Sequence, residues 1–65
     1  MKNRLSLEEE KYLNKLNRMN ALEIIDEEAI KCIDIIYIED EEDYMIIEKQ
    51  IAMIDAVLKA RMIKN

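Results

Sequence analysis

The sequence has no glycine, no proline and no histidine, and Cys32 is the single cysteine among 65 residues. Without glycine and proline, turns have to be made by Asn, Asp and Ser, and tight β-hairpins and phosphate-binding loops are disfavoured. Without histidine, the most common general acid–base group is missing, and one thiol alone forms neither a disulfide nor a zinc site. We therefore expect no enzymatic activity, no metal and no cofactor.

The length of the chain limits how it can be stabilised. A domain of this size buries only about 60% of its unfolded surface, and such domains usually need a disulfide, a metal or a partner chain. Composition argues against the first two, whereas 51% of the residues are hydrophobic and twelve are isoleucine. We therefore expect a single domain over residues 1–65 that associates as a homodimer.

The net charge and the lack of long apolar runs argue against nucleic acid and membranes as binding partners. The net charge of −5 disfavours direct binding to nucleic acid or to an anionic membrane. No stretch of 18 residues is apolar and free of charge, so a transmembrane helix is not expected. The single cysteine is typical of a reducing compartment, and we expect a cytoplasmic protein.

Two capping boxes predict where helices begin. In each, a Ser or Asn is followed three residues later by a Glu, and the two residues exchange side-chain-to-backbone hydrogen bonds. The boxes are formed by Ser6 with Glu9 and by Asn20 with Glu23. We therefore expect a first helix over about 6–19 and a second over about 20–38.

Apolar residues in both segments follow helical spacing. One side of the first helix carries Leu5, Tyr12, Leu16 and Met19. The second helix has the three- and four-residue spacing of a helical seam at Leu22, Ile25, Ala29, Cys32 and Ile36, with Ile33 beside it. We expect this stripe to face the third helix. Residues 32–38 also suit a β-strand, because Ile and Tyr favour strands, and that alternative stays open.

A third helix is expected over about 41–63, with two apolar stripes. The first stripe is Tyr44, Ile47, Ile51, Ile54 and Leu58, and it is expected to pack on the second helix. The second stripe is Ile46, Met53, Val57 and Ala60. A helix with two apolar stripes usually has two neighbours, so we assign the second stripe to a dimer or partner interface, with the first helix as the alternative.

The phase of these stripes predicts a turn between the second and third helices. Extending the stripe of the second helix by sevens would bury Glu39 and Asp43, whereas a turn at 39–43 avoids this. In an antiparallel hairpin, Lys59 and Arg61 would lie beside the acidic start of the second helix. The expected fold is all-α: a short N-terminal helix plus an antiparallel helical hairpin that dimerises into a helical bundle.

The most acidic part of the chain surrounds this turn. Residues 39–43 are five adjacent acids, and they lack the ligand pattern of an EF-hand calcium loop. We expect them either to cap the third helix or to bind a basic protein surface. We call the whole group the acidic pole. It consists of Asp34, Glu39, Asp40, Glu41, Glu42, Asp43 and Glu48.

These features predict a small non-enzymatic protein–protein interaction module. It would act as a regulator or inhibitor and bind a target protein, one with a basic surface, through an apolar helix face and the acidic pole. Two alternatives stay open: a nucleic-acid mimic that blocks a DNA-binding site, and an antitoxin-like or assembly subunit that is stable only with its partner.

Overall fold

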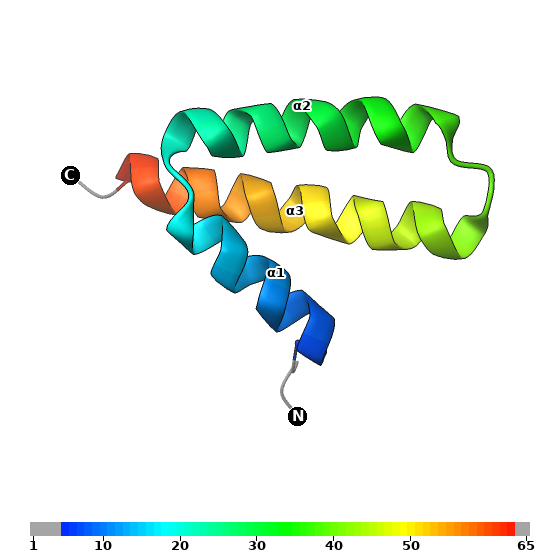
Figure 1. Cartoon of the computed structure of the whole chain (residues 1–65), viewed down its shortest axis with the longest axis horizontal. Helices are drawn as coiled ribbons and strands as arrows, with labels where there is room; N and C mark the ends of the chain where they lie inside the picture. The colour runs from blue at the N-terminus through cyan, green and yellow to red at the C-terminus, as the bar shows by residue number, and fades with distance from the viewer. Residues whose placement is uncertain (1–4, 64–65) are drawn as a thin grey trace.

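The structure is a computed structural model that describes residues 5–63. Over this range the chain forms three α-helices and no strand: α1 (Leu7–Arg18), α2 (Ala21–Tyr37) and α3 (Glu41–Ile63). α2 and α3 form an antiparallel hairpin (Figure 1). The C-terminal end of α1 lies against the C-terminal part of α3, and the N-terminal end of α1 points away from α3. The extents of 39 × 32 × 17 Å make the molecule little more than one helix thick, so each helix leaves a broad side exposed.

Both predicted capping boxes are confirmed. The Oγ of Ser6 accepts from the backbone N–H of Glu9 at 3.1 Å, and the Glu9 carboxylate accepts from the N–H of Ser6 at 2.9 Å. Asn20 and Glu23 exchange the corresponding hydrogen bonds at 2.9 Å each. These side chains satisfy backbone donors that a helix N-terminus leaves unpaired, so the chain starts two helices without glycine or proline.

The turn between α2 and α3 is also confirmed. Residues 38–40 connect the helices, and the Asp40 carboxylate accepts from the N–H of Glu42 at 2.9 Å. The first helical hydrogen bond of α3 runs from the Tyr44 N–H to the Asp40 carbonyl at 2.9 Å. Asp40 therefore caps α3, and Glu41, Glu42 and Asp43 occupy its first turn, where the helix dipole favours acids. Residues 32–37 are helical, so the strand alternative is wrong.

The core lies where the three helices meet. Leu16 of α1, Ile24 of α2 and Ile54 of α3 are fully buried, and Val57 is nearly so. The residues packed around them are Tyr12, Leu13, Met19, Met53 and Leu58. A side chain of this kind contributes about 1.5–3 kcal/mol when fully buried, so four of them form a small core.

Two of the predicted packing faces need correction. The stripe Leu22, Ile25, Ala29, Ile33 and Ile36 does not pack on α3, because all five residues are exposed. α2 instead turns Ile24 and Ile35 inward, together with Glu27 and Lys31, and the following residue Ile38 is also half-buried. Val57, assigned to a dimer or partner interface, lies in the core of the single chain, so that assignment is wrong. Of the apolar residues predicted on one side of the first helix, Leu5 precedes α1 and is exposed, whereas Tyr12, Leu16 and the C-cap residue Met19 face the core as expected.

Candidate functional site

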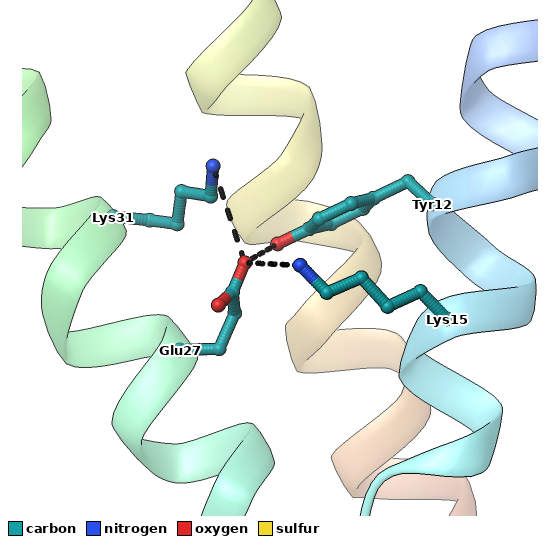
Figure 2. Close-up of polar contacts among 4 residues, drawn as sticks. All are labelled: Tyr12, Lys15, Glu27 and Lys31. Carbon is teal, nitrogen blue, oxygen red and sulfur yellow. Dashed lines mark hydrogen bonds and ion pairs between the residues drawn. The ribbon is translucent and has the colours of Figure 1, made fainter.

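A polar cluster joins α1 to α2 and fixes how α1 is placed (Figure 2). The hydroxyl of Tyr12 donates to Oε2 of Glu27 at 2.6 Å, and the Nζ atoms of Lys15 and Lys31 lie 3.9 and 4.0 Å from the same oxygen. Both ammonium groups also lie over the Tyr12 ring, at 5.7 and 5.5 Å from its centroid. Burial, followed by the hydrogen bond to the Glu27 carboxylate, raises the pKa of Tyr12 above its ordinary value.

A second set of contacts attaches α1 to α3. The guanidinium of Arg61 donates to the carbonyls of Leu16 and Asn17, each at 3.3 Å, and thereby caps the C-terminal end of α1. The expected pairing of Arg61 with the acidic start of α2 is therefore replaced by a contact with α1. Nearer the start of α1, the Nζ of Lys49 lies 3.6 Å from the Glu9 carboxylate in a largely exposed ion pair. The C-terminal half of α1 is thus held closely, and its N-terminal half only weakly.

The divergence of α1 from α3 leaves a groove of about 860 Å³ between them, which we call the α1–α3 groove. Its apolar lining comes from Tyr12, Met45, Ile46 and Met53. Glutamates and lysines of both helices form its borders: Glu8, Glu9, Glu42, Lys11, Lys15 and Lys49. Gln50 also lines the groove, and its amide oxygen is buried without a hydrogen-bond partner.

The acidic pole lies at the α2–α3 end of the molecule. All seven of its carboxylates are exposed, in the turn or within two helical turns of it. Glu42 belongs both to the pole and to the lining of the α1–α3 groove, so the two surfaces are continuous. Capping accounts for Asp40 and the helix dipole for Glu41 to Asp43, whereas Asp34, Glu39 and Glu48 have neither role.

The side of α2 turned away from α3 is a further apolar surface, which we call the outer face of α2. It contains eight exposed residues: Leu22, Ile25, Ala29, Ile30, Cys32, Ile33, Ile36 and Tyr37. None of the residues between 5 and 63 covers it. Apolar patches of this extent on a small protein usually mark a binding surface.

The residues predicted as an interface from the second stripe of α3 are divided by the structure. Ile46 and Met53 line the α1–α3 groove, Val57 lies in the core, and Ala60 is exposed outside the groove. Gln50 and Tyr12 were not predicted as site residues. A signal for Gln50 was present, since it is a single neutral amide between the two apolar stripes of α3, whereas Tyr12 depends on the placement of a distant helix.

We also searched residues 5–63 for a metal site and for a membrane-spanning helix. No group of three or more Cys, Asp or Glu residues in the 5–63 range is arranged to hold a metal ion. None of the described helices combines the length and the apolar character needed to span a bilayer. Comparison of the chain with protein-family models, with curated proteins and with solved structures finds no match.

Proposed function

We propose that this protein is a small non-enzymatic interaction module that binds a helix of a target protein in the α1–α3 groove, beside the acidic pole. The observation that carries this proposal is the unpaired amide oxygen of Gln50, buried beside an open groove that is also lined by Tyr12, Met45, Ile46 and Met53. A buried acceptor without a donor costs about 1–3 kcal/mol. If the Gln50 side chain turns toward the groove when a partner binds, a hydrogen-bond donor on that partner would remove this cost.

The dimensions and the lining of the groove suit a helical occupant. The lining part of α3 runs from Glu42 to Met53, which at 1.5 Å per residue is about 17 Å, or three helical turns. An amphipathic helix binds such a groove by inserting its apolar face, and methionine side chains adapt readily to the shape of an incoming surface. We expect the apolar residues of the target to contact Met45, Ile46 and Met53, and a polar donor to face Gln50.

Charge favours one direction for that helix. Within the groove, three glutamates and three lysines balance one another, whereas the acidic turn (residues 39–43) extends beyond Glu42 as an excess of negative charge. A target helix whose basic end points toward this turn would be steered into the groove and bound in one orientation. By occupying a helix that its target uses elsewhere, the protein would regulate or inhibit that target.

Capture of the target with matched variants tests this proposal. Wild-type protein, Ile46→Glu and Met62→Glu would be immobilised and exposed to a lysate of the native host, and bound proteins identified by mass spectrometry. Both substitutions add one acid at an exposed apolar residue of α3, but only Ile46 lines the groove. A protein retained by wild type and by Met62→Glu but lost with Ile46→Glu supports the proposal. If every captured protein also binds Ile46→Glu, the groove is not the target site.

The partner found in this way also separates the proposal from the nucleic-acid mimic. Duplex DNA would be added to the complex at low salt. A partner that binds through an apolar helix in the groove keeps its affinity, whereas a partner whose DNA site is occupied by the acidic pole is displaced. Displacement by DNA would therefore favour the mimic over the proposed module.

A further inference from the structure

The central stripe of the outer face of α2 has a symmetric spacing that the proposed function does not use. Its large aliphatic residues Leu22, Ile25, Ile33 and Ile36 are arranged around Ala29 with spacings of three, four, four and three residues. The stripe therefore reads the same in both directions along the helix. The exposed fractions follow the same symmetry, with 75% for Leu22 and 74% for Ile36, and 50% for Ile25 and 56% for Ile33.

We infer that this face binds the same face of a second copy of the chain, with the two α2 helices antiparallel and a twofold axis at Ala29. A twofold interface is self-complementary: if one residue contacts a second, the second contacts the first across the axis. In this arrangement Leu22 of one copy meets Ile36 of the other, and Ile25 meets Ile33. The small Ala29 meets itself where the two helices approach most closely.

The apolar area is sufficient for a stable pair. With Ile30 and Tyr37 included, the large side chains expose on the order of 700 Å², taking about 180 Å² for each fully exposed one. A standard interface buries about 800 Å² per partner, and soluble monomers rarely leave so large an apolar patch uncovered. The second copy therefore accounts for a surface that no helix of the same chain covers between residues 5 and 63.

Charge selects the antiparallel orientation. In a parallel pair, the two acidic turns would lie side by side and repel one another. In the antiparallel pair they are separated by the length of α2, about 25 Å, which exceeds the Debye length of about 8 Å at physiological salt. Each acidic turn then lies toward the end of the other copy where α2 begins and α1 and α3 end, which carries Arg18, Lys59 and Arg61 as well as Glu23 (Figure 1). Asp26, the acid nearest the stripe, lies level with Cys32 of the second copy and about 9 Å along the helix axis from the second Asp26.

Disulfide crosslinking tests this geometry. Helix axes about 8–10 Å apart, less two Cα radii of about 2.3 Å, bring the two Cα atoms of Ala29 to about 3.4–5.4 Å, and the upper part of this range is within disulfide reach. The double substitution Ala29→Cys and Cys32→Ser should therefore give a covalent dimer in high yield on mild oxidation. In wild type, the two Cys32 residues lie about 9 Å apart along the helix axes, so no crosslink should form. Crosslinking through Cys32 and not through residue 29 would overturn the antiparallel pairing.

Sedimentation at low micromolar concentration tests the surface itself. Wild type should have twice the 7.8 kDa mass of the chain, and Ile33→Glu should be monomeric. Met62→Glu, which adds the same charge at an exposed residue outside this face, should stay dimeric. A monomeric wild type, or a dimer that survives Ile33→Glu, would overturn the inference. The inference is independent of the proposed function, because Ile33→Glu tests the dimer and Ile46→Glu tests the target.

Discussion

At the scale of single residues, the hydrogen bond from Tyr12 to Glu27 connects the N-terminal helix to the hairpin. The hydroxyl donates to a carboxylate at 2.6 Å in a partly buried site, and two lysines share that carboxylate. Replacing Tyr12 by Phe keeps the ring in place and removes only the donor. We expect this substitution to lower the free energy of unfolding by about 1 kcal/mol, measured by chemical denaturation.

The matched control for this substitution is Tyr44→Phe. Tyr44 is exposed on α3 and lies outside the outer face of α2, so removal of its hydroxyl should change stability by less than about 0.5 kcal/mol. Equal effects of the two substitutions would mean that the Tyr12–Glu27 hydrogen bond does not stabilise the fold.

The raised pKa of Tyr12 gives a dependence of stability on pH. Because the folded state keeps this hydroxyl protonated to higher pH than the unfolded chain does, its stabilisation is complete below the unfolded pKa of 10. Above that pH the unfolded chain loses the proton first, and stability falls as pH rises toward the folded pKa. Denaturation between pH 9 and pH 11 should show a steeper loss for wild type than for Tyr12→Phe. Parallel profiles would contradict the assignment.

At the scale of the helices, the start points and the turn could be predicted because their signals are local. Ser6, Asn20 and Asp40 cap helices through backbone groups two or three residues away, and such contacts can be read from the sequence. The prediction of which side of α2 faces the core was wrong, because that side is decided by contacts with residues distant in the sequence. The most regular apolar stripe of α2 was assigned to the core, whereas burial follows contacts made with other helices.

Ile24 and Glu27 show which contacts decide the side of α2 that faces the core. Ile24 follows the Asn20 cap at the position where it packs toward Met19, so the cap itself turns Ile24 inward. Glu27, on the same side of α2, receives Tyr12 and Lys15 from α1. A carboxylate with partners on a distant helix can face the interior, and the isoleucines on the other side of α2 are then exposed. The spacing of Met19 and Ile24 around the Asn20 cap, known as a hydrophobic staple, is local and can be read from the sequence, whereas the Tyr12–Glu27 contact cannot.

The contact between Arg61 and α1 predicts how that helix opens. Replacing Arg61 by Gln removes the charged group that caps the Leu16 and Asn17 carbonyls. We expect amide hydrogen exchange in α1 to become about tenfold faster, while the central amides of α2 and α3 keep their protection, because only α1 loses a contact.

Lys59→Gln is the matched control, since Lys59 lies on the same helix and pairs with Asp55, one turn away in α3. It should leave α1 exchange unchanged, because an exposed ion pair of this kind contributes little. Faster exchange throughout the chain in Arg61→Gln would show that α1 and the hairpin unfold together and not separately.

At the scale of the whole molecule, the proposed function assigns the steering of the target to the acidic turn and its binding to the α1–α3 groove. Neutralising Glu39, Glu41 and Glu42 as glutamines leaves the Asp40 cap intact, so helicity measured by circular dichroism should change little. The association rate with the target captured by wild type should fall several-fold, because steering by the acidic turn is lost. An unchanged association rate would mean that these acids only solvate the turn and do not steer the target.

Dimerisation through the outer face of α2 predicts that thermal stability depends on protein concentration. A core of Leu16, Ile24, Ile54 and Val57 is small for an independent domain, so burial between the two chains would add substantially to stability. Mass action then raises Tm with concentration, by on the order of 5 °C for each tenfold increase in a dimer of two 65-residue chains. Thermal denaturation at about 5, 50 and 500 μM protein measures the slope of Tm against the logarithm of concentration. Ile33→Glu should melt at a lower temperature that does not change with concentration, whereas Met62→Glu keeps the slope. A wild-type Tm that is constant over this range would mean that the fold is complete in one chain.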